Sequence, residues 1–447
     1  MTVAWNKVVI QKNLFLNMRL LVKCRKELIN RCIIHIAEKW RGKSWNTSSY
    51  FHISTSSRSL ILGIETSCDD TGCAIVDNSG RILGEALHSQ QETHLKYGGI
   101  IPPVAKNLHR KHIDRVVKDA VAAANIDVSE VDAIATTVKP GLPLSLVVGM
   151  EYGKQMCLEY DKPFIPIHHM EAHALTIRMI QEVEFPFLVL LISGGHCLLS
   201  VVKAVDKFLL LGSSLDDAPG EAFDKVIRRL KLRNMPEFCN MSGGAALEKA
   251  AERGDPLAFE FPSVMTQYRD CNFSLAGLKN KARRHIIEEE IKHEIEGDGI
   301  IPGVFDLCAS FQLAVSVHLC RRVQRAMDYI ELKNLLPSDS KHLVVSGGVA
   351  CNGYIAHMLS VVCGKYGYEL AVPPPHLCTD NGVMIAWNGM ERWQAGVGIY
   401  QDFKGIDIES KFLLRFWCVT YPEEFQTCDA SLSDAHVEPS VELSMTS

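Results

Sequence analysis

The segment PIHHMEAHALTI at 166–177 places three histidines and a glutamate within six residues. His169 and His173 are four positions apart, so on a helix their imidazoles lie on one face, one turn apart. Two imidazoles in this arrangement are typical ligands of a single metal ion. The alternative is an ordinary pair of surface or core histidines, and for an isolated H-x-x-x-H sequence that is the more common case.

The segment differs from the zinc-protease motif H-E-x-x-H. In that motif the glutamate directly follows the first histidine and reaches the metal-bound water. Here Met170 takes that position. Glu171 lies roughly 200° around the helix from His169, because an α-helix has about 3.6 residues per turn. The sequence therefore predicts two metal ligands without the general base of a zinc protease.

The composition is that of a soluble globular protein with one large or two ordinary domains, since 447 residues are 47% hydrophobic and 22% charged. No apolar run approaches the ~20 residues of a membrane helix, so we expect no membrane association. The 15 cysteines are an odd number without a C-x-x-C pair. This argues against a disulfide framework or a zinc ribbon and favours a reducing compartment.

The N-terminal 60 residues contain eleven Lys and Arg but only Glu27 and Glu38 as acids. A basic, Ser-rich and acid-poor leader is typical of a mitochondrial transit peptide, so we predict a disordered transit peptide at 1–57 and a matrix location. The alternative is a disordered basic tail that binds a partner. The acidic, Ser- and Thr-containing segment 412–447 is expected to be poorly ordered.

The rest of the chain is acidic. The whole protein has a net charge of −5, so about −14 remains once the leader's +9 is set aside. Any nucleic-acid partner must therefore meet a local basic patch. The candidates are RKH at 110–112, KVIRRLKLR at 225–233, KNKARRH at 279–285 and RR at 321–322.

Two stretches, 59–88 and 187–211, read as meanders of short strands, and each is followed by helices. This repetition predicts a duplicated α/β unit. Helices are expected at 103–125, 143–160, 220–232, 243–253, 277–295, 305–329 and 379–393, with a further one after the turn at 346–352.

A predicted strand followed by Ser-Gly-Gly also occurs twice, in LLISGGH at 190–196 and LVVSGGV at 343–349. Each follows an apolar strand. Glycines there allow a ligand to approach the backbone closely, and bare N–H groups favour phosphate oxygens. A single such turn has no ligand in most proteins, but the repetition suggests a nucleotide between two halves. No P-loop or G-x-G-x-x-G sequence is present.

Nine motifs together resemble the TsaD family of tRNA threonylcarbamoyltransferases, once labelled glycoproteases, and with the leader its mitochondrial branch. The resemblance covers roughly 60–405. The motifs, in family order, are GIETSCDDT (63–71), PGL (140–142), IHHMEAH (167–173), LLISGGH (190–196), GEAFDK (220–225), SGGAALE (242–248), SFQ (310–312), SGGVACN (346–352) and CTDNG (378–382).

The resemblance implies an α/β fold of the actin/hexokinase/Hsp70-like (ASKHA) type, with two ribonuclease-H-like lobes around a cleft. The first lobe would span 58–185, completed by a C-terminal helix at about 380–400, and the second 186–379. The implied reaction transfers a threonylcarbamoyl group from threonylcarbamoyl-adenylate (threonylcarbamoyl-AMP) to an adenosine beside the anticodon of tRNAs that read codons beginning with A. A separate synthase would supply the adenylate, and a homodimer is implied.

By resemblance, His169 and His173 are a metal pair and Asp380 is the third ligand. This set suits one divalent ion per subunit, zinc or iron, with positions left open for substrate. The ion would act as a Lewis acid on the acyl-adenylate. The alternative for Asp380 is a helix N-cap, because a helix follows it.

The resemblance also implies a set of substrate-binding residues. They are Ile192, Ser193, Gly194, Gly195, His196, Asp224, Gly244, Glu248, Cys351, Asn352 and Thr379. For Asp224 and Glu248, a surface-helix carboxylate is the alternative. No general base is assigned. Glu65 and Asp69, with Asp70 beside them, lie in the first turn of the first lobe and are candidate catalytic residues.

Four positions depart from the usual pattern of the family. His168 stands where asparagine is common, as either a residue that supports the metal pair or an exposed side chain. Lys139 and Pro143 flank PGL, and Cys351 replaces a small residue.

Three other functions are considered. They are a metalloprotease, an ATP-binding kinase or chaperone of the same fold, and a non-enzymatic scaffold subunit.

Overall fold

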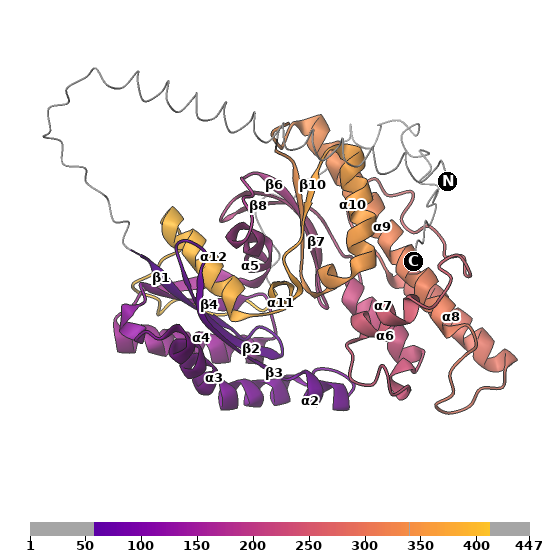
Figure 1. Cartoon of the computed structure of the whole chain (residues 1–447), viewed down its shortest axis with the longest axis horizontal. Helices are drawn as coiled ribbons and strands as arrows, with labels where there is room; N and C mark the ends of the chain where they lie inside the picture. The colour runs from indigo at the N-terminus through magenta and orange to yellow at the C-terminus, as the bar shows by residue number, and fades with distance from the viewer. Residues whose placement is uncertain (1–57, 339, 412–447) are drawn as a thin grey trace, which may run out of the picture. The chain divides into compact units, whose positions relative to one another are not determined.

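The computed structural model describes residues 58–338 and 340–411. The predicted transit peptide and the predicted C-terminal tail lie outside the described residues. Within the described part, ten strands form two five-stranded sheets, called sheet A and sheet B here (Figure 1).

Sheet A contains β1 (Leu60–Glu65), β2 (Asp70–Asp77), β3 (Ile82–Ser89), β4 (Ala133–Lys139) and β5 (Phe164–His168). Their order across the sheet is β3-β2-β1-β4-β5. The first three strands form an antiparallel meander, and β4 and β5 then add parallel to β1. The predicted first meander is therefore confirmed.

Sheet B contains β6 (Phe187–Ile192), β7 (Cys197–Ala204), β8 (Lys207–Ser213), β9 (His342–Ser346) and β10 (Glu369–Ala371). Its order, β8-β7-β6-β9-β10, repeats that of sheet A strand for strand. The meander is again antiparallel, and β9 and β10 are again parallel to the first strand. The repeated topology confirms the predicted duplicated α/β fold.

Both faces of sheet A are covered, because alternate residues of a strand point to opposite faces. Leu62 and Ile64 of β1 face a core that is shared with α3 (Pro102–Ala124) and α4 (Pro143–Tyr160). Ile61, between them, faces a core that is shared with α12 (Gly382–Ala395). The C-terminal helix thus packs on the sheet formed by the N-terminal strands (Figure 1).

Sheet B is also covered on both faces, and one of its covering helices follows the last strand of sheet A. Phe187, Val189 and Leu191 of β6 face a core that includes Met170 and Ala174 of α5 (His169–Leu175). Helix α5 leaves the last strand of sheet A and packs on sheet B, whereas α12 follows the last strand of sheet B and packs on sheet A. The two helices contact each other, so each crosses from its own sheet to the other.

The other face of sheet B carries the remaining large helices. Leu188, Leu190 and Ile192 share that core with helices α6 to α10. Their bounds are α6 (Pro219–Arg229), α7 (Gly243–Ala251), α8 (Ala276–Lys292), α9 (Val304–Lys333) and α10 (Gly353–Tyr366). These helices, and α3, α4 and α12, lie close to their predicted ranges. The short helices α2 (Gln91–Lys96) and α11 (Pro375–Cys378) were not predicted.

Four 3₁₀ turns complete the described part: η1 (Val128–Glu130), η2 (Thr176–Met179), η3 (Leu232–Asn234) and η4 (Gly348–Cys351).

Glycines allow α12 to approach sheet A closely. A Cβ atom added to Gly63 of β1 would lie 2.2 Å from the backbone nitrogen of Ala386. One added to Gly382, the first residue of α12, would lie 2.4 Å from the carbonyl carbon of Cys73. Backbone therefore meets backbone at this contact, and any side chain there would push α12 away from the sheet.

One helix in the described ranges, α9, is long and apolar enough to cross a membrane, judged by length and composition alone. Its most apolar stretch is 67% buried inside the fold. The core helix of a soluble protein meets the same criteria, so the absence of membrane association stays a prediction.

Candidate metal and nucleotide site

The histidine helix begins where β5 ends. His168 is its N-cap: the side-chain Nδ1 accepts a hydrogen bond from the backbone N–H of Met170 at 3.2 Å. Such a bond satisfies one of the free donors of the first helical turn. His168 is buried, so the interpretation of this residue as an exposed side chain is wrong. Its capping role starts α5 at His169 and so sets the direction of the helix.

Asp380 lies between α11 and α12. The N-cap of α12 is Asn381, whose side chain accepts from the backbone N–H of Met384 at 2.9 Å. The alternative that Asp380 is the cap is therefore wrong. Because Asn381 takes the capping role, the carboxylate of Asp380 is left to face the two histidines of α5.

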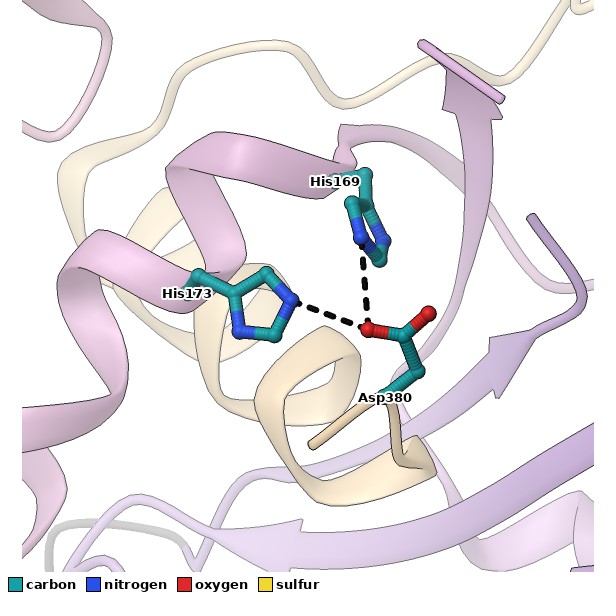
Figure 2. A group of neighbouring side chains, drawn as sticks. All are labelled: His169, His173 and Asp380. Carbon is teal, nitrogen blue, oxygen red and sulfur yellow. Dashed lines mark hydrogen bonds and ion pairs between the residues drawn. The ribbon is translucent and has the colours of Figure 1, made fainter. Parts of the chain in front are cut away.

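His169, His173 and Asp380 come together across the contact between α5 and α12. The Oδ1 atom of Asp380 lies 3.4 Å from Nε2 of His169 and 3.1 Å from Nε2 of His173. One donor atom of each residue lies within 4.8 Å of the other two. Figure 2 shows both imidazoles pointing at the same carboxylate oxygen. Two imidazole nitrogens and one carboxylate oxygen are a donor set that zinc and iron(II) accept.

Glu65, at the end of β1, holds His169 in place. The Nδ1 atom of His169 lies 3.1 Å from Oγ of Ser67 and 3.5 Å from Oε1 of Glu65. Glu65 is fully buried, and it also accepts from the backbone N–H of Ser67 at 2.6 Å and from the hydroxyl of Thr137. A proton on Nδ1 that is donated to this group leaves the lone pair of Nε2 directed at the cluster, as a metal ligand requires.

The charges in the cluster are strongly coupled. Burial lowers the pKa of His169, but the carboxylates of Asp380 and Glu65 outweigh it and raise that pKa to about 9. Burial raises the pKa of Asp380, yet His169 and His173 hold it well below the usual range of a carboxyl. In the absence of an ion, the carboxylate is thus stabilised by imidazolium charge, a role that a metal cation could take over.

Further carboxylates surround this cluster. Burial raises the pKa of Asp70 to about 7, and the nearby charges of Asp69 and Asp380 add to the increase. Burial and the charge of Asp380 also raise the pKa of Asp69. A local excess of negative charge in a partly buried site favours a bound cation.

Glu171 points away from the histidines, as its spacing predicts. It is buried and forms an ion pair with Arg392 of α12, whose Nη2 atom lies 2.6 Å from the carboxylate. This pair joins α5 to α12 on the side opposite the cluster, so its role is to hold the two helices together.

The first Ser-Gly-Gly loop lies beside the cluster. The hydroxyl of Ser193 accepts from the backbone N–H groups of Gly195 and His196, at 3.3 and 3.1 Å. A Cβ atom added to Gly194 or Gly195 would meet nothing within 4 Å, so the space above this loop is open. The His196 ring centroid lies 6.5 Å from that of His169, and burial lowers the pKa of His196 to about 4. Ile192, at the end of β6, is buried beneath the loop.

The second Ser-Gly-Gly loop follows β9 and leads through η4 into α10. Asn352 is the N-cap of α10, accepting from the backbone N–H of Ile355 at 2.9 Å and donating to Oε1 of Gln312 at 3.0 Å. Glu248 of α7 accepts from the backbone N–H of Gly353 at 2.7 Å. The sequence-predicted residues Glu248 and Asn352 therefore lie next to each other.

Asp224 contacts the start of α7. A Cβ atom added to Gly243 would lie 1.9 Å from its Oδ1 atom, and the nearest cation, Arg233, is 3.9 Å away. Gly244, next in the chain, would place a Cβ near only Phe223, at 3.9 Å. Asp224 thus packs against the first residue of α7, while Gly244 borders open space.

Cys351 and Thr379, the remaining predicted contacts, are both exposed. Cys351 lies at the end of η4 and Thr379 follows α11.

Two of the four basic segments meet in one groove between α6 and α8. It has a volume of about 360 Å³ and an apolar floor of Val226 and Ile286; its basic lining residues are Lys225, Arg228, Arg229, Lys279 and Arg283. Lys225 and Lys279 are paired with Asp217, and Arg229 with Glu290. For Arg228 and Arg283, which are exposed, the described residues offer no carboxylate within ion-pair distance.

In the basic pair at 321–322, Arg321 is exposed and donates to the hydroxyl of Ser263 at 2.8 Å, whereas Arg322 has a structural role. Arg322 is buried and donates hydrogen bonds to the backbone carbonyls of Met265, Tyr268 and Asp270. It fixes the loop before α8 and is not available as a nucleic-acid contact.

Sequence reasoning missed the support of His169 by Ser67 and the proximity of His196 to the metal pair. Ser67 lies within the GIETSCDDT motif, but nothing in its spacing identifies a partner 102 positions away. It also missed the hydrogen bonds of buried His109 to Thr71 at 2.8 Å and to the carbonyl of Cys68 at 3.0 Å, which brace the same turn.

Residues 81–387 match the model of the TsaD family, described as tRNA N6-adenosine threonylcarbamoyltransferase. The chain is 52% identical over 370 residues to the mitochondrial tRNA N6-adenosine threonylcarbamoyltransferase of Danio rerio, covering 83% of this chain and 91% of that protein. It is 51% identical over 352 residues to the protein of the same name from Homo sapiens, covering 79% and 85%.

Among solved structures, the chain is similar to full-length HypF in its phosphate- and nucleotide-bound form. The TM-score is 0.46 at 13% sequence identity, and the match covers 78% of this chain and 47% of that one.

Proposed function

This chain belongs to the TsaD family of tRNA N6-adenosine threonylcarbamoyltransferases, and we propose that it moves the threonylcarbamoyl group of threonylcarbamoyl-adenylate to an adenosine of mitochondrial tRNA. It is a tRNA-modifying transferase of the mitochondrion with an ASKHA-type fold. The finer proposals are that it acts in the matrix, on the adenosine just 3′ of the anticodon, in tRNAs that read codons beginning with A.

The observation that carries the proposal is the meeting of His169 and His173 of α5 with Asp380, which lies just before α12. We propose that these residues hold one divalent ion, zinc or iron(II), through the two Nε2 atoms and Oδ1. The donor types fit, Nδ1 of His169 is held by Ser67 and Glu65, and the surrounding carboxylates provide negative charge.

When bound, the ion supplies a Lewis acid for the carbonyl of the threonylcarbamoyl group. The protein's part is to keep the donor atoms in position. Glu65 and Ser67 orient His169, the cap by His168 fixes the start of α5, and the Glu171–Arg392 pair joins α5 to α12. Glu65 is therefore proposed as a positioning residue, which changes the initial hypothesis of a catalytic role. Asp69 remains a candidate that lies close to Asp380.

The adenylate is proposed to bind across the two Ser-Gly-Gly loops. The open space over Gly194 and Gly195 suits the close approach of a phosphate, which would share the N–H groups of Gly195 and His196 with the Ser193 hydroxyl, and His196 borders the metal pair. The remaining proposed contacts are Ile192, Ser193, Asp224, Gly244, Glu248, Cys351, Asn352 and Thr379. Glu248 and Asn352 already have internal partners, so a nucleotide would share their remaining acceptor and donor positions.

The tRNA is proposed to contact the basic groove between α6 and α8. Arg228 and Arg283 are exposed, and within the described ranges neither has a carboxylate at ion-pair distance, while paired cations line the groove around them. Phosphate contacts of this kind position a nucleic acid without reading its sequence. A separate synthase as the source of the adenylate, and a homodimer, remain part of the proposal.

The metalloprotease alternative is not favoured, since Met170 occupies the position of the protease base and Glu171 is paired with Arg392. The kinase or chaperone alternative predicts ATP turnover without tRNA.

The test is a reconstituted assay. Protein with a measured metal content is mixed with threonylcarbamoyl-adenylate and unmodified mitochondrial tRNA, and nucleosides are analysed by mass spectrometry. Threonylcarbamoyladenosine formed by this chain alone is the expected result. Absence of product in metal-loaded protein, also after addition of a mitochondrial extract depleted of this chain, would contradict the proposal. ATP hydrolysis that is independent of tRNA would favour a kinase or chaperone.

A further inference from the structure

Two cysteines lie together beside the site although they are 27 positions apart in the sequence. Cys351 is the last residue of η4 and Cys378 the last residue of α11, and these two short elements pack against each other. The two thiols are within hydrogen-bonding reach of one another. Neither role described above, adenylate contact or metal binding, requires a second sulfur at this place.

The local contacts agree with this close approach. The Sγ atom of Cys351 lies 3.8 Å from the backbone carbonyl oxygen of Pro375, within α11 itself. The Sγ atom of Cys378 lies 3.1 Å from the carbonyl oxygen of Pro373. Both thiols thus contact backbone carbonyls of the same short segment, 373–378.

The pair also differs in exposure. Cys351 is exposed and Cys378 is buried. Cys239 is the other exposed cysteine in the described ranges, and its thiol faces the carbonyl of Pro236, three residues before it in the chain. An exposed thiol with a second thiol in contact is the arrangement in which oxidation at the first sulfur is resolved by the second.

We propose that Cys351 and Cys378 form a reversible disulfide under peroxide, and that this disulfide slows the transferase. The second half rests on the proposed function, whereas formation of the disulfide does not.

One molecule of H₂O₂ is enough to oxidise the two thiols to a disulfide. The sulfur of Cys351 attacks one oxygen of H₂O₂, the O–O bond breaks, and the products are a sulfenic acid and water. The sulfur of Cys378 then attacks the sulfur of Cys351; the S–O bond breaks, and the departing hydroxyl takes up the proton of the Cys378 thiol and leaves as the second water. Two thiols lose two electrons and two protons in total, and the peroxide is reduced to two waters. A thiol reductant reverses the reaction by exchange.

The effect on transfer follows from the neighbours of the pair. Asn352, which caps α10, directly follows Cys351, and Asp380 lies two residues after Cys378. The sulfurs of a disulfide are only about 2.05 Å apart, much closer than two hydrogen-bonded thiols, so η4 and α11 must shift toward each other. Asp380 would then move relative to His169 and His173. Misplacement of such a group by about 1 Å can cost 100-fold in rate.

The test uses the full chain, fully reduced, then treated with one equivalent of H₂O₂ and quenched with N-ethylmaleimide. Peptide mass spectrometry should find the peptides of Cys351 and Cys378 cross-linked, with the loss of two hydrogens, and dithiothreitol should release them. Cys351→Ser should abolish this cross-link, and the matched control Cys239→Ser should keep it. Because Cys351 is exposed, its serine variant avoids the risk of misfolding that a change at the buried Cys378 carries.

Activity is compared within each protein, oxidised against reduced. In the wild type the ratio of transfer rates should fall at least about tenfold and recover with dithiothreitol, and in Cys351→Ser it should stay near one. An absent cross-link, or oxidation of Cys351 to sulfinic acid without one, overturns the disulfide. A cross-link with an unchanged rate overturns its effect on transfer. A reduced protein that does not transfer at all contradicts the proposed function, while the cross-link result still decides the disulfide.

Discussion

Sheets A and B have the same strand order and directions, yet the ends of equivalent strands carry different chemistry. The turn after the first strand of sheet A contains a buried carboxylate, Glu65, and a serine that contacts His169. The equivalent turn of sheet B is Ser-Gly-Gly-His, with open space above its glycines. In the first lobe this turn places ionisable and polar side chains next to the cluster. In the second lobe the equivalent turn places backbone atoms next to open space.

The metal candidates follow the fifth strand of each sheet, so they come from corresponding positions of the two lobes. Strand β5 and strand β10 are the fifth strands of their sheets, and the residues after them lead to His169 and to Asp380. Each following helix crosses to the other sheet, α5 to sheet B and α12 to sheet A. Exchange of these helices brings the two strand ends together, so a site with three donors needs both halves of the duplication.

The largest effect is expected from variants of the proposed metal ligands, which are the ionisable groups of this comparison. His169→Ala and Asp380→Asn should each lower transfer by more than about 100-fold, since even partners that only orient metal ligands are worth 10- to 100-fold. Metal content by mass spectrometry should fall in parallel. The matched control is His357→Ala, at an exposed position of α10, which should retain both. Full metal content and activity in His169→Ala would remove the metal role.

Gly63→Ala tests the close packing of α12 on β1, which positions Asp380 beside the histidines. The new Cβ would lie 2.2 Å from the backbone of Ala386, so we expect a loss of about 3 kcal/mol in the free energy of unfolding. Gly364→Ala, in an open, exposed part of α10, should instead stabilise by about 0.5–1 kcal/mol. Denaturant unfolding measures both. Equal effects at the two sites would mean that the close packing of α12 on β1 is not a determinant of stability.

Glu65→Gln tests whether the buried carboxylate acts through His169. The amide keeps the shape but loses the charge, so metal affinity should fall about 10- to 100-fold. Titration with zinc in a competing chelator gives the affinity, and excess zinc should restore much of the transfer rate. A normal affinity combined with lost activity would instead indicate that Glu65 contacts the reacting groups.

Gly195→Val tests the glycine side of the comparison. Its Cβ would meet no protein atom within 4 Å, so the fold should tolerate the change. A branched side chain would fill the proposed path of the adenylate phosphate, and KM for threonylcarbamoyl-adenylate should rise about tenfold, the effect of losing about 1.4 kcal/mol of binding. Metal content should be unchanged. An unaltered KM would place the adenylate elsewhere.

Arg283→Glu is expected to have the smallest effect. It should weaken tRNA binding several-fold and reduce the slope of log affinity against log salt by about one, as for one lost phosphate contact. KM for the adenylate should not change. Arg115→Glu, on the exposed face of α3, is the control and should leave tRNA affinity unaltered. Weaker tRNA binding in Arg115→Glu, with unaltered binding in Arg283→Glu, would indicate that tRNA binds the first lobe.

The sequence predicted local structure well wherever short-range rules decide it. Pro143, at the start of α4, and Gly367, in left-handed conformation after α10, are helix start and stop signals that need no tertiary information. Residue types and spacing also identified the imidazole pair of α5. The alternative that Asp380 caps α12 is wrong, because Asp and Asn are both good N-caps and only the surroundings decide that Asn381 takes this role.

What the sequence determined by itself is the set of elements, the duplicated fold and the family, since each depends on periodicity and on motifs of a few adjacent residues. Only the tertiary structure decided that Glu65 and Ser67 hold His169, that Glu171 pairs with Arg392, and that Cys351 meets Cys378. Each of these contacts joins segments far apart in the chain. The contacts of His169 and Glu171 depend on how α5 and α12 cross between the sheets, and no local pattern encodes that crossing.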